Sequence, residues 1–111
     1  MKMTYAAVQV ALALMEDPSG KHWGYDLSKK SGVRSGALYP ILHRMLNDGL
    51  LSDGWETSTA GRPPRRHYEI TERGATELGA LLARAHAEQR FIVPAATPGF
   101  ARFGLTQIGL G

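Results

Sequence analysis

The feature that most limits how this chain can fold is an apolar segment near its start. Thr4 is a residue type that caps helices and Pro18-Ser19-Gly20 is a stop, so the pattern predicts a helix from Thr4 to Asp17. Its apolar residues occupy every face: Tyr5, Ala6, Ala7, Val8, Val10, Ala11, Leu12, Ala13, Leu14 and Met15. A helix of this kind in water must be buried on more than one side. Because a chain of 111 residues has a modest core, we expect one side to meet a second subunit.

The apolar run does not have the pattern of a targeting or membrane segment. Tyr5 to Met15 is too short to span a bilayer. Gln9 interrupts the run, and no small-x-small cleavage site follows Leu14, which argues against a secretory signal. The chain has no cysteine, so disulfides and thiolate metal sites are excluded, and a reducing compartment is compatible. The net charge of +3 favours acidic partners in only a general way.

Two further helices are expected before the middle of the chain. The first runs over Tyr25–Ser31, with Gly32 as its C-terminal stop. The second runs from Ser35, its expected cap, to Asp48, and Gly49 ends it. Pro40 would then lie near the first turn, where a missing N–H costs least. Three helices with short, glycine-containing connections match a helix-turn-helix plan.

A hairpin is expected next. Trp55-Glu56-Thr57 and His67–Ile70 alternate as strands do. Between them lies a basic tip in which Pro63 and Pro64 cannot donate ladder hydrogen bonds. The fold class predicted for the chain is therefore mainly α with a small β-hairpin (α+β), a winged helix-turn-helix followed by a C-terminal dimerisation helix.

The last helix is expected from Glu72 to Phe91, capped by Thr71. Its apolar residues recur at alternating spacings of three and four, as they do along the seam of a coiled coil. The seam spans under three heptads, so the first helix should supplement it in a four-helix interface between two subunits. The alternative is that the last helix folds back over the first helix of its own chain. The predicted dimerisation residues are Tyr5, Val8, Leu12, Ala75, Leu78, Leu82, Ala85 and Ile92.

The chain divides in this interpretation into three parts: a winged helix-turn-helix over residues 1–71, the dimerisation helix over 72–93, and an apolar tail over 94–111. The tail contains Pro98 and four glycines, so it should not be a long helix, yet it is more apolar than an ordinary solvated end.

The strongest chemical signal is the hairpin tip Gly61–Arg66, which has three arginines and no acid. Guanidinium groups suit phosphates and can enter a minor groove, although a solvated basic loop is the plainer alternative. The third helix begins with small residues, so its N-terminal N–H groups can approach a phosphate or base edges. Tyr39 could donate to a phosphate or be a core aromatic. The predicted DNA-binding residues are Lys29, Lys30, Arg34, Ser35, Gly36, Ala37, Tyr39, His43, Arg44, Arg62, Arg65 and Arg66.

Several motifs together resemble the PadR-type winged-helix repressors. They are Gly24-Tyr25-Asp26-Leu27, the stretch Ser35-Gly36-Ala37-Leu38-Tyr39-Pro40-Ile41-Leu42-His43-Arg44-Met45-Leu46, Gly49-Leu50-Leu51, and Gly61–Thr71 with Gly74. The resemblance covers residues 5 to about 78, in order and with the right gaps. It implies a cytoplasmic, nucleoid-associated homodimer that represses transcription at inverted repeats of double-stranded DNA, released in many members by a small, often aromatic ligand. It also implies that the Ser35–Ala37 turn and Tyr39 meet the major groove and that Arg62, Arg65 and Arg66 lie on the wing.

The chain departs from that family at its C-terminal end. Many members carry a long helical C-terminal domain, whereas a single helix is expected here after Thr71. A single C-terminal helix matches the short branch of the family. The resemblance therefore does not fix how an effector binds or how the two subunits of the dimer are arranged.

Other functions find little support in the sequence. His22, His43, His67 and His86 show no metal-ligand spacing, and no cofactor motif or catalytic triad is present, so no enzyme activity, metal or cofactor is expected. Trp23 could stack a flat ligand at the dimer centre, near the first and last helices, or simply pack. The rival functional class is a winged-helix module that binds protein and no DNA, which would have no need of the wing arginines.

Overall fold

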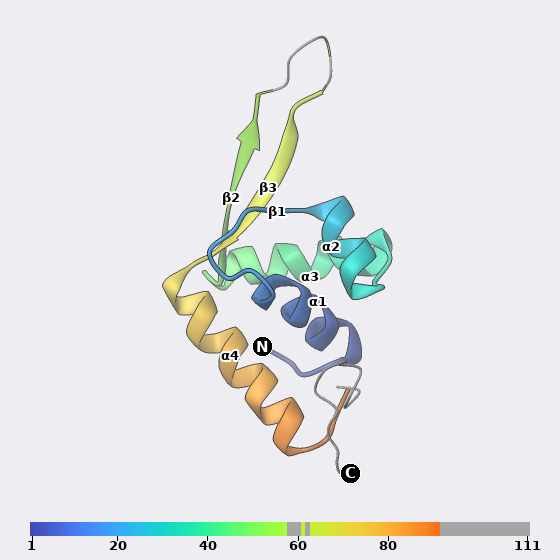
Figure 1. Cartoon of the computed structure of the whole chain (residues 1–111), viewed down its shortest axis with the longest axis vertical. Coiled ribbons are helices and arrows are strands. Elements are labelled where there is room, and N and C mark those ends of the chain that lie inside the picture. The colour runs from blue at the N-terminus through green and yellow to red at the C-terminus, as the bar shows by residue number, and fades with distance from the viewer. Residues whose placement is uncertain (58–60, 62, 92–111) are drawn as a thin grey trace.

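The computed structural model describes residues 1–57, 61 and 63–91. Four helices surround a small core, and a long two-stranded hairpin projects from one end of the molecule (Figure 1). The fold is α+β, as predicted. Its elements are α1 Tyr5–Met15, β1 His22–Trp23, α2 Gly24–Ser31, α3 Ser35–Asn47, β2 Leu51–Glu56, β3 Arg65–Ile70 and α4 Glu72–Ala87.

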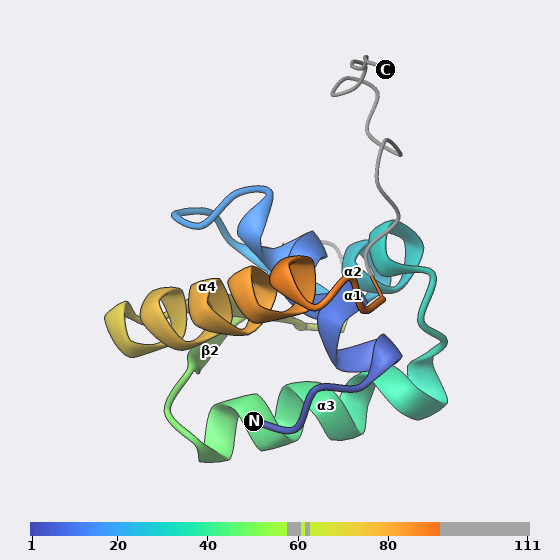
Figure 2. The ribbon, with the colours of Figure 1, turned by 90° about the horizontal axis from the view of Figure 1, so that it is seen from below.

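Helix α1 lies in the middle of the helical layer, between α3 and α4 (Figure 2). The predicted cap is confirmed, because the Thr4 hydroxyl accepts a hydrogen bond from the Ala7 N–H at 3.1 Å. The buried residues of α1 are Ala7, Val8, Val10, Ala11, Ala13 and Leu14, and they cover more than half of its circumference. The remaining side carries exposed Tyr5 and half-buried Gln9 and Leu12. Helices of the same chain thus cover most of α1, and the expectation that its remaining side meets a second subunit stays a prediction.

Helices α2 and α3 form the expected helix-turn-helix. Gly32 ends α2 with a φ of 73°, as predicted. Helix α3 begins at Ser35, one residue earlier than a Ser35 cap would require, and Arg34 occupies the N-cap position without a side-chain capping hydrogen bond. Pro40 is consequently the sixth residue of α3 and lies beyond the first turn, so the helix lacks the hydrogen bond that Pro40 would donate to Gly36.

The sheet has the strand order β1-β3-β2, and both pairs are antiparallel. The predicted strands are confirmed in part, since β2 begins four residues before Trp55 and ends before Thr57, and β3 begins two residues before His67. Strand β1 was not predicted. It consists of His22 and Trp23 paired with Tyr68 and His67, and it attaches the start of α2 to the base of the hairpin.

Helix α4 is capped as predicted, because the Thr71 hydroxyl accepts a hydrogen bond from the Gly74 N–H at 2.9 Å. It ends at Ala87, before the expected Phe91. Gln89 and Phe91 have positive φ values of 54° and 65° and turn the chain back towards α1. The side-chain amide of Gln9, on α1, donates a hydrogen bond to the Phe91 carbonyl at 2.5 Å. The rings of Phe91 and Tyr5 meet edge-on, with their centroids 6.1 Å apart.

The residues of the predicted seam lie on two neighbouring faces of α4, one buried and one partly exposed. One stripe is buried against the rest of the chain and consists of Gly74, Leu78, Leu81 and Ala85. Of the predicted dimerisation residues, Val8, Leu78 and Ala85 are fully buried within their own chain and cannot meet a partner. Tyr5 and Ala75 are exposed, Leu12 and Leu82 are half-buried, and Ile92 and the 94–111 tail lie outside the described residues.

None of the helices in the described part of the chain is long and apolar enough to cross a membrane.

The joint between α4 and the helix-turn-helix generates a test of the packing. A Cβ at Gly74 would collide with the Leu50 carbonyl oxygen, whereas a Cβ at Gly36, also in the first turn of a helix, would meet nothing within 4 Å. We expect Gly74→Ala to lower the free energy of unfolding by about 1–3 kcal/mol. Gly36→Ala should leave it unchanged or raise it by up to about 1 kcal/mol. Urea denaturation measures both, and equal stabilities of the two variants would contradict the packing described.

Candidate nucleic-acid interface

Helix α3 turns one uncharged face to solvent. Its buried residues are Leu38, Leu42 and Met45. On the opposite side, at spacings of three and four residues, are four exposed residues: Gly36, Pro40, His43 and Asn47. Gly36 and His43 were predicted site residues, whereas Pro40 and Asn47 were not, although the helical period of the buried stripe could have indicated them.

The start of α3 is open. Arg34, Ser35, Gly36 and Ala37 are all exposed, and a Cβ at Gly36 would have empty space around it. Because no side chain caps this end, the first N–H groups of α3 and the positive end of its dipole face solvent. This is an arrangement that accepts a phosphate or permits close approach to base edges.

The hairpin of β2 and β3 extends away from the helices (Figure 1). Arg65 is exposed on it, and its guanidinium lies over the Trp23 ring at 5.3 Å. Arg66 differs from Arg65, because its Nε and Nη2 donate to Asp53 Oδ2 at 2.8 and 2.6 Å. The predicted phosphate contact from Arg66 thus competes with an ion pair on the neighbouring strand, and Arg62 lies outside the described residues.

A cavity of about 370 Å³ lies between the hairpin and the two helices of the helix-turn-helix. We call it the wing cavity. It is lined by Trp23, Gly24, Tyr25, Tyr39, Trp55, Arg65, Arg66 and Tyr68.

Tyr39 connects α3 to the wing cavity and is not a core residue, since 47% of it is exposed. Its ring lies against the first residue of α2, where a Cβ on Gly24 would collide with the Tyr39 hydroxyl. Tyr68 also lines the cavity and is 2% exposed. Burial raises the pKa of the Tyr68 phenol above its ordinary value, and the nearby charge of Arg66 offsets part of that effect.

The two lysines of α2, Lys29 and Lys30, lie in different surroundings. Lys29 lies over the Tyr25 ring at 5.4 Å, beside the wing cavity. Lys30 is 3.8 Å from the Glu16 carboxylate, at the end of α1. Only Lys29 is therefore placed beside the cavity that adjoins the hairpin.

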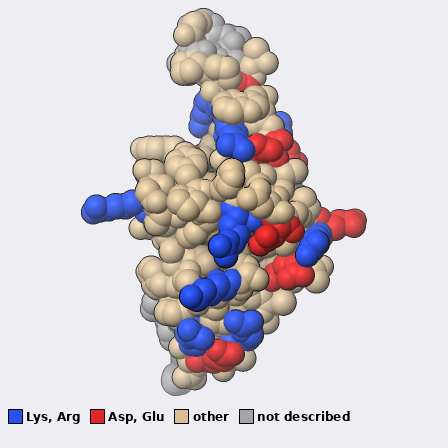
Figure 3. Space-filling view, turned by 180° about the vertical axis from the view of Figure 1, so that it is seen from behind, with Lys and Arg blue, Asp and Glu red and all other residues tan. Residues whose placement is uncertain are grey.

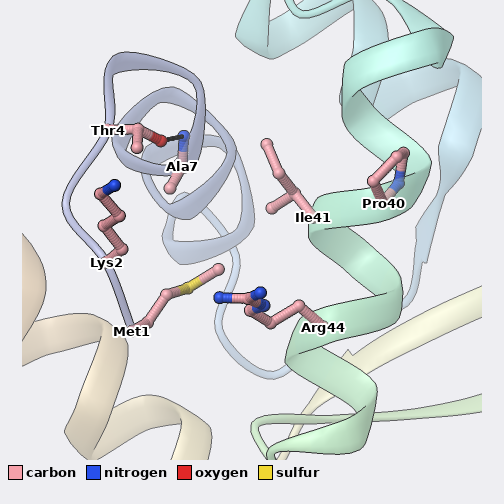
Figure 4. A pocket seen from close by; sticks show the side chains of 7 residues that line it. All are labelled: Met1, Lys2, Thr4, Ala7, Pro40, Ile41 and Arg44. Carbon is pink, nitrogen blue, oxygen red and sulfur yellow. Dashed lines mark hydrogen bonds between the residues drawn. The ribbon is translucent and has the colours of Figure 1, made fainter.

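Arg44 lines a second cavity of about 230 Å³ between α3 and the N-terminal segment (Figure 4). In that view the guanidinium of Arg44 extends towards Met1, and Lys2 lies across the opening. Lys2 is a cation that the sequence interpretation did not include, because no helical or strand pattern links it to α3.

The face seen in Figure 3 mixes basic and acidic side chains and does not form a patch of one sign. A general attraction to polyanions is therefore weak there, and binding of nucleic acid would depend on particular residues.

The predicted ligand residue Trp23 lines the wing cavity, and Trp55 lines the same cavity. The expected ligand position near the first and last helices stays a prediction. Among the described residues, no group of three or more His, Cys, Asp or Glu side chains could hold a metal ion.

The chain is similar to known proteins of one family. The model of the Transcriptional regulator PadR-like family matches residues 12–80. A PadR-like transcription factor from Bacteroides fragilis is 31% identical in sequence, and the match covers 77% of this chain and 85% of that chain with a TM-score of 0.60. No curated protein matches the chain.

Two more distant structures share the fold. Bacillus subtilis PadR, in complex with operator DNA, is 20% identical, with 68% of this chain and 47% of that chain covered and a TM-score of 0.55. Bordetella bronchiseptica BpsR, whose DNA binding is regulated by 6-hydroxynicotinic acid, is 22% identical, with 79% and 61% covered and a TM-score of 0.57. At these identities the likeness concerns the fold alone.

Burial of Tyr68 predicts a pH effect on stability. Because the folded protein holds the phenol neutral above the unfolded pKa of about 10, the unfolded chain releases this proton first as the pH rises. The stabilisation is complete below that value and is lost as the pH approaches the folded pKa. Tyr68→Phe should therefore lose less unfolding free energy than the wild type between about pH 9 and about pH 11. Denaturation at several pH values measures this, and equal losses would show that Tyr68 titrates normally.

Proposed function

This chain belongs to the PadR-like family of transcriptional regulators, and from that premise we propose that it represses transcription by binding double-stranded DNA at an inverted repeat as a homodimer. The single observation that carries the proposal is that Tyr39 of α3 and Arg65 of the hairpin line the same cavity, and that Tyr39 lies one turn after the open start of α3 at Ser35.

In the proposed complex, α3 enters the major groove. Gly36 and Ala37 let the backbone approach base edges, His43 reads a base, and the exposed Ser35 and Tyr39 hydroxyls donate to phosphates. The hairpin follows the adjacent backbone, where Arg65 provides a cation without an acidic partner among the described residues. Lys29 and Arg34 flank this surface, and Arg44 with Lys2 offers cations on the other side of α3.

Dimerisation is proposed through the second stripe of α4. Ala75, Gly79, Leu82 and His86 follow spacings of three and four residues beside the buried stripe, and none carries a fixed charge. The other flank of α4 carries Arg73, Glu77 and Arg84, which suits solvent. Exposed Tyr5 lies at the start of α1 and would extend the contact. A two-fold axis there would present two α3 helices to major grooves roughly 34 Å apart, or a multiple of that.

We also propose that a small aromatic ligand releases the DNA. The regulation of BpsR, which shares the fold, by 6-hydroxynicotinic acid supports this proposal.

The wing arginines provide the test of DNA binding. If each protomer makes about four phosphate contacts, the slope of log affinity against log salt should be about −7 for the dimer. Arg65→Ala should flatten it by about 2 on DNA from upstream of the protein's own gene. Arg66→Ala should have a smaller effect, because Asp53 already neutralises Arg66.

Arg84→Ala is the matched control, since Arg84 is an exposed arginine of α4 that pairs with Glu88. Fluorescence anisotropy over a salt series measures each slope. Absence of DNA binding by the wild type would favour the protein-binding module, and a slope unchanged by Arg65→Ala would remove the wing from the interface.

The dimer is tested by a pair of equal substitutions on α4. Ala75→Glu places like charges in the proposed stripe, whereas Ala80→Glu adds the same charge on a different exposed face of the helix. We expect a dimeric wild type, a dimeric Ala80→Glu variant and a monomeric Ala75→Glu variant with weakened DNA binding. Sedimentation at micromolar concentration measures the mass, and a wild type of 12.1 kDa would contradict the proposal.

A further inference from the structure

The cavity between the N-terminal segment and α3, which we call the N-terminal cavity, is mainly apolar. Four of its seven lining residues are Met1, Ala7, Pro40 and Ile41, and none of the seven is acidic. In Figure 4 the Ile41 side chain points across the cavity towards the first turn of α1. The volume of about 230 Å³ is below the range of small-molecule sites, roughly 300–1,000 Å³. One apolar side chain of a protein therefore suits it better than a separate ligand.

The apolar tail over residues 94–111, which lies outside the described residues, has the composition that such a cavity would accept. Arg102 is its one charged residue, and it contains no acidic one. Two of the three phenylalanines of the chain belong to it, Phe100 and Phe103. Burial of an aromatic ring in an apolar cavity is favourable because it removes the ring from water. The tail is therefore a candidate occupant of the N-terminal cavity.

The described part of the chain ends beside one wall of this cavity. Phe91, its last residue, lies edge-on to Tyr5 with the ring centroids 6.1 Å apart. Tyr5 is in the first turn of α1, between Thr4 and Ala7, which both line the cavity. Phe100 follows Phe91 by nine residues, and at about 3.3 Å per residue these can span roughly 30 Å. Because a helix with its side chains is only about 10–12 Å across, Phe100 can pass round this turn and reach the cavity.

From these observations we infer that the tail of the same chain docks in the N-terminal cavity, with a phenylalanine ring of the Phe100–Phe103 segment against Ile41. The link to Phe91 favours this occupant, because a short linker holds a tethered group at an effective concentration of about millimolar. A single ring can then fill the cavity without a large interface. The tail of a second copy and a separate peptide are the other occupants, and neither has this short link.

Docking of the tail would hinder the proposed contact with DNA. Pro40 belongs to the uncharged face of α3 and Arg44 offers a cation beside it, and both line the N-terminal cavity. A docked tail would cover part of the surface that faces DNA, so it would inhibit DNA binding by its own chain. This consequence rests on the proposed function, whereas the docking does not.

Nuclear Overhauser effects in the full chain test the docking. Met1 and Ile41 carry methyl groups at the cavity, and we expect both to show contacts with ring protons of Phe100 or Phe103. The double variant Phe100→Ala with Phe103→Ala should lose these contacts and shift both methyl signals. The double variant Ile108→Ala with Leu110→Ala is the matched control, because it shortens two apolar side chains of the same tail and should keep the contacts.

A substitution in the cavity tests the same contact from the other side. Ile41→Asn puts a polar amide in the apolar wall and should weaken the ring contacts of the Met1 methyl group, with circular dichroism as the check of folding. If Ile41→Asn unfolds, the tail variants decide, because they leave every described residue unchanged.

Three results would overturn the inference. The first is a wild type without ring contacts to Met1 or Ile41. The second is a pair of methyl signals that are identical in the wild type and the double phenylalanine variant. The third is a set of ring contacts found only between copies that carry different isotopes, which would assign the cavity to the tail of a second copy.

DNA affinity separates this inference from the proposed function. The double phenylalanine variant should bind upstream DNA at least threefold more tightly than the wild type, and the Ile108→Ala with Leu110→Ala control should bind as the wild type does. If the ring contacts are present and no protein binds DNA, the docking stands and the proposed function fails. If DNA binds and the ring contacts are absent, the docking fails and the proposed function stands. Ring contacts together with equal DNA affinities would overturn the inhibition.

Discussion

The burial of α1 by its own chain is the constraint on which the rest of the structure depends. Its alanines and Val8, Val10 and Leu14 allow α2, α3 and α4 to pack around it, so a small protein gains one continuous core. Within that core each outer helix needs only one apolar stripe. The opposite side of α3 and one flank of α4 are consequently left free, and these are the surfaces for which we propose DNA and a second subunit.

The position of the hairpin follows from short connections to this core. Gly49 ends α3 with a φ of 77°, and Leu50 and Leu51 enter the core at the start of β2. At the other end of the hairpin, the Thr71 hydroxyl donates to the Gly49 carbonyl at 2.7 Å, and Gly74 lies against Leu50. Because both ends of the hairpin are held at one joint, the wing keeps a fixed relation to α3 although its tip lies far from the core (Figure 1).

Features set by neighbours in the sequence were predictable. The caps at Thr4 and Thr71 and the stop at Gly32 depend on residues within one turn, and the family motifs kept their spacing, so the fold class followed from the sequence. Features set by distant residues were not predictable. Two-residue β1 has no periodic pattern, α4 ends where Gln9 and Tyr5 hold Phe91, and Arg66 pairs with Asp53 across the sheet. The extent to which the chain itself covers α1 was not predictable either, since one helix pattern cannot show how many neighbours will pack against it.

The central claim is that the uncharged face of α3 and the base of the wing form one DNA-binding surface. Mapping amide shifts on addition of a duplex from upstream of the protein's own gene tests it most directly. We expect the largest changes at Gly36, His43 and Arg65, with little change at Arg73 and Arg84 on α4. Changes confined to α4, or a spectrum unaffected by DNA, would contradict it.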